Sequence, residues 1–289
     1  MKGKYLVLAL LVLLVPLGPA RADFELPIVS PVTKILSVPY DFDPSSLSRF
    51  AGINELVLEL RMTRGNMVPD WLVSYLKTNF QTVTVRVVLS GTIRPLHVDQ
   101  LRRIPRYEIQ YHPGKSRVSS DTINTLYTLG PVRKLIVLPA DFSKKDLAAV
   151  RKLKNYTIAV DTRKKALSEE QLGWLSQDRN HRKILFIPAG FDPRKVYDLV
   201  TLSPVELRIY TKNNRIEAGL LNVLKDLKKV NFTLVVNGRV TLEDAKQFSR
   251  LERFTLRIEV TRPGDSTPGM VKVLNRIAPP QTPIKARNP

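Results

Sequence analysis

The chain has 289 residues, with 46 Lys or Arg against 26 Asp or Glu, so its net charge at pH 7 is +20. It contains no Cys, which excludes disulfides and leaves burial of its apolar residues, 43% of the chain, as the source of stability. The excess of cations favours an acidic partner, although a high positive charge also serves solubility alone.

The first 22 residues have the three-part layout of a secretory signal peptide. Lys2 and Lys4 precede an apolar run over residues 5–17, and a small-residue cleavage site follows before Asp23. The run is shorter than the about 20 apolar residues that a membrane anchor needs, and an uncleaved anchor is the alternative. We therefore predict an exported protein, periplasmic or secreted. Cleavage removes three cations and no acid, so the mature chain would carry a charge of +17.

Two short patterns alternate along the rest of the chain. The first is residues 38–42, Val-Pro-Tyr-Asp-Phe, which returns at 138–142 and 187–191, with weaker copies at 89–93 and 236–240. The second stands at residues 62–64, 112–114, 161–163, 211–213 and 261–263. Spacings within each series are 49 to 51 residues. The pattern predicts five double repeats, or ten single units, over residues 32–278.

Each single unit begins with a short β-branched run and continues with apolar residues at helical spacing. The expected strands include residues 56–60, 83–87, 207–209 and 256–258. The expected helices include those around residues 147–153 and 220–227. Helix starts are indicated by a hydroxyl followed by an acid: Ser143 and Asp146, Ser168 and Glu170, Thr241 and Glu243. Units of 22 to 27 residues leave room for neighbouring parallel strands joined by short crossovers.

Two architectures fit this order of elements: an open, right-handed α/β solenoid and a closed (β/α) barrel. We predict the solenoid, because ordinary barrels have eight units of about 30 residues. In addition, one strand face carries charges that a packed interior rarely tolerates and a solvated concave sheet would. These are Glu59, Arg86, Glu108, Glu206, Arg208, Arg257 and Glu259.

Nearly every unit opens with the phrase apolar-x-x-apolar-x-apolar, as in Ile53-x-x-Leu56-x-Leu58. The phrase resembles the opening of a leucine-rich repeat, which implies a solenoid with the strands on its concave face. Leu135 and Leu207 take comparable phrase positions, so both are expected to face the core. The chain departs from the family where an Asn or Cys is usual, because Asn237 is the one Asn among nine such positions: Arg61, Val88, His112, Ala140, Asp161, Ala189, Tyr210, Asn237 and Glu259. Residues 23–31 would cap the first repeat, and the Pro-rich residues 279–289 would form a disordered tail.

Motifs for metal or cofactor chemistry are absent from the sequence, and we predict neither a metal nor a cofactor. His97, His112 and His181 fall on three different units. Gly114-Lys115-Ser116 resembles the end of a phosphate-binding loop, but Ile109 stands where such a loop needs a Gly. We therefore predict an ordinary turn there. Carboxylates at strand ends could form an acid–base pair for glycoside hydrolysis. The candidates are Asp41, Asp141, Asp161 and Glu259.

The functional prediction depends on the loops of the longer units, which all carry cations. These are Arg64, Lys115, Arg117, Arg163, Lys164, Lys165, Lys212, Arg215 and Arg262. Loops on alternate parallel strands recur about every 10 Å along one edge, so these residues would form a basic stripe. We predict a repeat scaffold that binds an acidic polysaccharide, lipid headgroup or protein outside the cytoplasm, without specific nucleic acid, and leave open whether it is an enzyme. The alternatives are a (β/α)-barrel hydrolase of envelope polysaccharide and a structural component of envelope assembly.

Overall fold

The computed structural model describes residues 34–43, 47–48, 50, 56–62, 65–81, 83–114, 117–179, 181–227, 230–251, 254–261 and 273. The predicted signal peptide, N-terminal cap and C-terminal tail all lie outside these ranges. No helix within the described ranges is long and apolar enough to cross a membrane.

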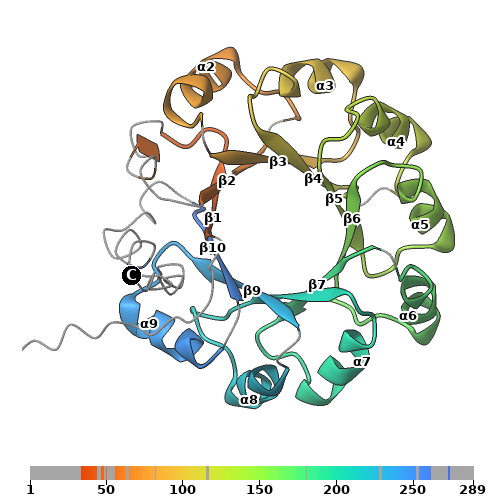
Figure 1. Ribbon diagram of the computed structural model, residues 1–289, viewed down its shortest axis with the longest axis vertical. Helices are drawn as coiled ribbons and strands as arrows, with labels where there is room; N and C mark the ends of the chain where they lie inside the picture. Colours follow the sequence, from red (N-terminus) through yellow and green to blue (C-terminus); the bar gives the residue numbers. More distant parts are fainter. Residues whose placement is uncertain are drawn as a thin grey trace, which may run out of the picture.

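The described chain folds into a parallel sheet that closes on itself (Figure 1). Neighbours in sequence are neighbours in the ring, and β1 pairs in parallel with both β2 and β10. The ten strands of the described ranges are β1 (Lys34–Pro39), β2 (Leu56–Arg61), β3 (Thr84–Ser90), β4 (Tyr107–His112), β5 (Lys134–Pro139), β6 (Tyr156–Asp161), β7 (Lys183–Pro188), β8 (Val205–Tyr210), β9 (Asn231–Asn237) and β10 (Phe254–Glu259).

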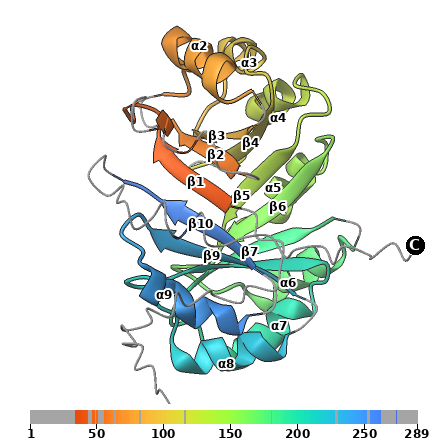
Figure 2. The same ribbon diagram turned by 60° about the vertical axis from the view of Figure 1, so that its left-hand side comes forward.

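Short helices cover the outside of the ring, one after another around its circumference (Figures 1 and 2). They are α2 (Asp70–Asn79), α3 (Pro95–Leu101), α4 (Ser120–Tyr127), α5 (Lys144–Val150), α6 (Glu169–Ser176), α7 (Val196–Val200), α8 (Ala218–Asp226) and α9 (Leu242–Lys246), with 3-10 turns at η1 (Pro193–Lys195) and η2 (Gln247–Arg250). Helices of only 5 to 10 residues explain how each unit stays so compact.

The sequence signals for the helix starts are confirmed, with the acid or amide one residue later than expected in two cases. The Ser143 hydroxyl accepts a hydrogen bond from the Asp146 backbone amide, and the Asp146 carboxylate accepts one from the Ser143 backbone amide. At α6 the partner of Ser168 is Gln171 rather than Glu170. At α9 the partner of Thr241 is Asp244 rather than Glu243. Each capping box satisfies amides that the first helical turn leaves without partners.

The prediction of an open solenoid, and with it the resemblance to leucine-rich repeats, is wrong. Closure through the β1–β10 pairing makes the fold the (β/α) barrel held as the alternative, with ten strands in place of the usual eight. The argument from charge failed because a wider ring of ten strands holds ion pairs inside. Glu59, for example, is fully buried and bonds to Arg257.

The apolar core lies mainly between the outer face of the barrel and the helices. One set of alternate strand residues, such as Leu58, Ile136 and Leu207, packs there against the helical apolar residues. Leu135 belongs instead to a smaller apolar cluster on the inner side, with Val137, Ala159, Ile184 and Phe186. Leu135 and Leu207 are thus both buried, as expected, but they face opposite sides of the sheet.

Candidate anion site inside the barrel

The 49-residue repeat stacks inward-facing residues in rings. Glu59, Glu108 and Glu206 share one repeat position, at which Thr157 and Thr255 stand in the other two units. The next inward position, two residues later, holds Arg61, Gln110, Ala159, Arg208 and Arg257. A strand turns every second residue to the same face, so acids and arginines come to lie in adjacent layers inside the barrel.

The middle of the barrel is closed by a buried ion pair. Arg257 donates to Glu59 at 2.6 Å, and the Ser37 hydroxyl donates to the same carboxylate at 2.9 Å. Burial by itself would raise the pKa of Glu59, but the guanidinium groups of Arg257, Arg86 and Arg208 outweigh it, and the pKa is lowered. Glu59 is therefore ionised in the folded protein.

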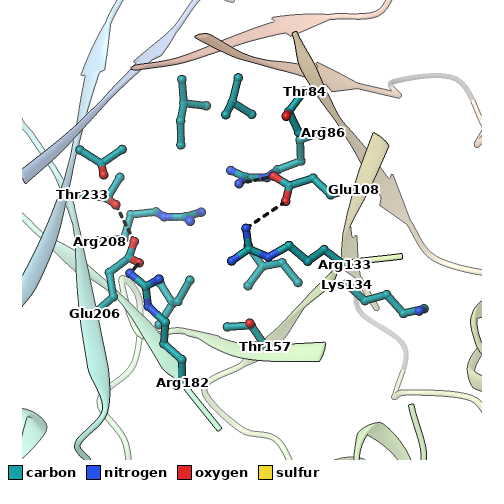
Figure 3. Close-up of a pocket in the computed structure, with 15 residues that line it drawn as sticks. Thr84, Arg86, Glu108, Arg133, Lys134, Thr157, Arg182, Glu206, Arg208 and Thr233 are labelled. Atoms are coloured by element: carbon teal, nitrogen blue, oxygen red, sulfur yellow. Dashed lines mark hydrogen bonds and ion pairs between the residues drawn. The ribbon is translucent and has the colours of Figure 1, made fainter. Parts of the chain in front are cut away.

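A cavity of about 290 Å³ occupies the barrel interior at the N-terminal ends of the strands (Figure 3). Most of its lining comes from the first two residues of each strand and from Arg133 and Arg182, which precede β5 and β7. The side chains of Arg133 and Arg182 are 69% and 44% exposed, so the cavity opens to solvent at this end. We call it the lumen pocket; its lining is Ile35, Val57, Thr84, Arg86, Glu108, Arg133, Lys134, Leu135, Thr157, Arg182, Ile184, Glu206, Arg208, Thr233 and Thr255.

One wall of the lumen pocket holds Glu108 between two arginines. Arg86 donates to the Glu108 carboxylate through Nε at 2.7 Å and approaches it with Nη2 at 2.5 Å. Arg133 lies 3.9 Å from the other carboxylate oxygen. Nη1 of Arg86, which is 3.6 Å from Glu59, has no hydrogen-bond partner among the described residues. This wall therefore carries more positive charge than its carboxylate neutralises.

The opposite wall holds Glu206 between Arg182 and Thr233. Arg182 donates to one carboxylate oxygen at 2.5 Å, and the Thr233 hydroxyl donates to the other at 2.5 Å. Arg133 and Arg182 are 49 residues apart and occupy the same position in consecutive double repeats. The two walls therefore use the same two repeat positions but pair them differently: Arg133 lies beside the glutamate of the preceding strand, β4, and Arg182 beside that of the following strand, β8.

Arg208 projects from β8 into the space between these walls (Figure 3). It is 2% exposed, and within the described part of the chain its Nε and Nη1 atoms have no hydrogen-bond partner. Its guanidinium lies 4.7 Å from the centre of the Phe186 ring. Burial, and then the charge of Arg257, lower the pKa of Arg208. A buried guanidinium with unmade hydrogen bonds is costly, and an anion in the pocket would remove that cost.

Lys134 contributes little to the charge inside the pocket, although it lines it. Its ammonium group points away from the cavity (Figure 3) and donates to the carbonyls of Gly130, Val132 and Lys154 at 2.7 to 3.2 Å. The ammonium therefore ties together three loop carbonyls, and the guanidinium groups supply the positive charge of the pocket.

The C-terminal mouth of the barrel holds a different group of side chains. Asp161 and Arg163 form a bidentate pair at 2.7 and 2.8 Å, and the Arg163 guanidinium stacks 4.0 Å from the centre of the Tyr210 ring. Burial alone would raise the pKa of Asp161, but the bonds from Arg163 outweigh it, and the pKa is lowered. Nε2 of His112 lies 2.8 Å from Nε2 of Gln110, and burial lowers the pKa of His112 to about 4.

The residues of the predicted basic stripe fall into three groups. Arg64, Lys115 and Arg262 lie outside the described residues. Lys164 and Lys165 are exposed and line a cavity of about 290 Å³ with His112, Asp141 and Asp161, whereas Lys212 and Arg215 line a separate one of about 510 Å³. Arg117 and Arg163 are exposed and line neither cavity, and the Arg163 guanidinium is bonded to Asp161.

The candidate carboxylates are also divided. Asp141 and Asp161 line one cavity, Glu259 lies 3.0 Å from Arg257, and Asp41 is exposed in the turn after β1. No group of three or more His, Asp or Glu in the described ranges could hold a metal ion.

The lumen pocket was missed by reasoning from the sequence, although its residues were noticed. Arg86, Glu108, Glu206 and Arg208 had been identified as a charged strand face, but a solvated concave sheet was assumed. The 49-residue spacing of Glu59, Glu108 and Glu206 could have indicated a ring of acids with arginines two residues further on.

The strand order defines the class of the protein as a closed parallel (β/α) barrel. No family model and no curated protein sequence matches the chain. Among solved structures, the fold is similar to that of orotidine 5'-monophosphate decarboxylase from Methanocaldococcus jannaschii, with 8% identity and a TM-score of 0.43. The alignment covers 86% of this chain and 98% of that one. A likeness this distant says nothing of activity, so the function must be argued from the interior of the barrel.

Proposed function

We propose that the protein is an exported (β/α) barrel that binds a small anion in the lumen pocket. The observation that carries the proposal is Arg208, which is buried, lines the cavity and has two nitrogen atoms without a partner among the residues that the structure describes. The proposal keeps the acidic partner expected from the net charge but places it inside the barrel. A pocket of about 290 Å³ admits a small molecule and excludes a polymer chain.

Further support comes from the balance of charge around the pocket. Arg86, Arg133, Arg182 and Arg208 face Glu108 and Glu206, so the lining has an excess of positive charge. Arg208 is buried within this lining, and a charge shielded from water attracts an anion more strongly than the same charge on the surface. Arginine is suited to this task because its planar fork donates two parallel bonds to a carboxylate or a phosphate.

The test uses inorganic phosphate and sulfate as probes of the purified mature protein at low salt. We expect saturable binding by calorimetry and a rise in the melting temperature, since a ligand at 100 times its Kd stabilises by about 2.7 kcal/mol. Arg208→Met should lose this binding while being as stable as, or more stable than, the wild type without anion. Removing an unpaired buried charge relieves its desolvation cost.

Arg102→Met is the matched control, because Arg102 is an exposed arginine at the C-terminal end of α3 that pairs with Asp99 and does not line the pocket. It should bind phosphate as the wild type does. A structural role for Arg208 would give the opposite pattern, in which Arg208→Met lowers the melting temperature and the anion response stays unchanged. That result would overturn the proposal.

A second candidate function is hydrolysis of an acidic polysaccharide at the C-terminal mouth, where (β/α)-barrel enzymes have their active sites. It is favoured by the cavity that joins Asp141 and Asp161 to Lys164 and Lys165. Arg163 lowers the pKa of Asp161, so Asp161 would serve as base or nucleophile, with Asp141 as the second carboxyl group of the pair. Release of reducing ends from acidic glycans, abolished by Asp141→Asn and by Asp161→Asn, is the expected result. No release from a broad set of glycans would dismiss this candidate.

A further inference from the structure

We infer that the ligand of the lumen pocket is a small dianion that carries hydroxyl groups. This inference rests on the proposed anion binding and names the class of ligand for the same site. It follows from three features of the pocket: the number of charges, their position on two walls, and the polar residues between them.

The number of charges is fixed by the residues that line the pocket in the described part of the chain. Four guanidinium groups face two carboxylates there, while the Lys134 ammonium is bonded to carbonyls outside the cavity. The deeper Arg257 bonds to Glu59 and lies 3.0 Å from Glu259, and these three residues are not part of the pocket lining. An excess of two positive charges is therefore left, and a ligand with two negative charges balances it.

The position of the charges explains which groups the ligand would contact. Arg182 is held by Glu206 at 2.5 Å, whereas Arg208 makes no hydrogen bond to a carboxylate of the described residues and extends between the walls (Figure 3). On the other wall, Arg86 and Arg133 share the single carboxylate of Glu108. The uncompensated charge thus lies on both sides of the cavity. A dianion can balance this positive charge either with one phosphate group between the walls or with two carboxylates, one at each end of the molecule.

The polar residues between the charges are threonines. Thr84, Thr157 and Thr255 line the pocket from β3, β6 and β10, and Thr157 and Thr255 stand at the repeat position that holds glutamate in the other three units. A threonine hydroxyl both donates and accepts hydrogen bonds. A ligand with a hydrocarbon body would leave these groups without partners once water is displaced, whereas a hydroxylated body would satisfy them.

The size of the cavity fits a compact molecule of this kind. Its volume of about 290 Å³ equals that of roughly ten water molecules at about 30 Å³ each. Short hydroxylated acids and polyol phosphates are of this size. The apolar patches formed by Ile35, Val57, Leu135 and Ile184 leave room for the carbon skeleton between the polar groups.

The experiment compares five probes by calorimetry at equal ionic strength: inorganic phosphate, succinate, tartrate, gluconate and glycerol 3-phosphate. Tartrate and succinate are dianions that differ in hydroxyl groups, and gluconate has hydroxyl groups with a single charge. We expect tartrate or glycerol 3-phosphate to bind at least ten-fold more tightly than gluconate, and each more tightly than its counterpart without hydroxyls. The stronger of the two shows whether the charges lie on one head group or on two.

The substitution Thr157→Val tests the hydroxyl contacts, since valine has nearly the shape of threonine. It should reduce the preference for tartrate over succinate several-fold while succinate binds as before. Thr84→Val repeats the test on β3 should the first variant fold poorly. Thr78→Val is the control, because the Thr78 hydroxyl is exposed and bonds to the Ser74 carbonyl of its own helix.

Each failure has its own meaning. Equal affinity for gluconate and the dianions would overturn the charge requirement, and equal affinity for succinate and tartrate would overturn the hydroxyl requirement. In both cases Arg208-dependent binding of phosphate would persist, and the proposed function would stand. The absence of binding by all five probes would overturn the proposed function together with this inference.

Discussion

Arg257 and Glu59 are 198 positions apart in the sequence, and Nη2 of Arg257 lies 2.6 Å from Oε1 of Glu59 inside the barrel. Arg257 belongs to β10 and Glu59 to β2, the two strands on either side of β1. The ion pair therefore spans the seam at which the first and last described strands meet. Glu59 is fully buried and Arg257 is 3% exposed, so neither charge has water to replace its partner.

Glu59→Leu should destabilise the protein by about 3–5 kcal/mol, because it removes the fully buried partner of Arg257 and leaves that charge with the more exposed Glu259. Urea denaturation followed by circular dichroism measures the change. The double variant Glu59→Leu/Arg257→Met should recover most of the loss, since it removes both charges together. Asp99→Ala, which breaks an exposed pair with Arg102, is the control and should change stability by less than about 1 kcal/mol. A single variant as stable as the wild type would contradict the role of the seam.

The strands, the helix starts and the ten-unit repeat could be predicted from the sequence because they depend on local patterns. Ser143 and Asp146, for instance, are three residues apart and form their capping box as expected. Closure could not be predicted in the same way. Closure depends on the small rotation between neighbouring units, summed over ten units. The sequence pattern of a single unit does not reveal this rotation. Both an open and a closed sheet place the same residues on the strands.

The charged interior was misjudged for a related reason. Alternation shows that Glu59 and Arg257 share a face, but it does not show that residues 198 positions apart meet across a seam. Without that contact the charges appear to need water. The lumen pocket depends on closure of the ring, because closure determines which charged residues meet inside the barrel. Among the described residues, Arg208 and Arg257 are both buried with Nε and Nη1 unpartnered, but Arg257 bonds to Glu59 whereas Arg208 bonds to no carboxylate.

Leu207→Ala and Leu135→Ala should differ in cost, because the two leucines face opposite sides of the sheet. Leu207 is fully buried between the barrel and the helices, where truncation should cost about 2–5 kcal/mol. Leu135 lines the lumen pocket, so its truncation enlarges an existing space and should cost less, about 1–2 kcal/mol. Chemical denaturation of both variants gives the comparison. Equal losses would mean that Leu135 is packed on all sides.

Acidification should weaken the protein through His112. Burial lowers the pKa of His112 in the folded protein to about 4, below its ordinary value of 6.5. Between these values the unfolded chain binds more protons than the folded chain, so stability is full above pH 6.5 and falls as the pH drops toward 4. The whole window corresponds to about 3 kcal/mol at most. The neutral ring accepts a hydrogen bond from Gln110 that a protonated ring could not.

The variant His112→Gln isolates this contribution from the carboxylates that titrate nearby. Its unfolding free energy should depend less on pH between 4 and 6.5 than that of the wild type, and the two curves should run parallel above pH 7. Urea denaturation at half-unit steps of pH measures both curves. Parallel curves over the whole range would show that His112 titrates alike in the folded and unfolded chains.

The basic loop after β6 tests whether the C-terminal rim binds an acidic polymer as well. Lys164 and Lys165 are exposed there, whereas the guanidinium of Arg163 is held by Asp161 and by the Tyr210 ring. An extended polyanion would therefore contact the two lysines, and Lys164→Ser/Lys165→Ser should weaken retention on heparin several-fold. The slope of log affinity against log salt should fall by about two, one for each lost contact.

Adding Arg163→Ser to this double variant should weaken heparin binding little further, because Arg163 already has its carboxylate partner. Stability of the lysine variant should stay within about 0.5 kcal/mol of the wild type, since exposed loop charges contribute little to folding. Lys144→Ser/Lys145→Ser on α5 is the control for the change in net charge, as both of its lysines are exposed and line neither cavity of the C-terminal face. If the control loses as much affinity as the loop variant, then heparin responds to the overall charge, and the rim holds no specific site for a polymer.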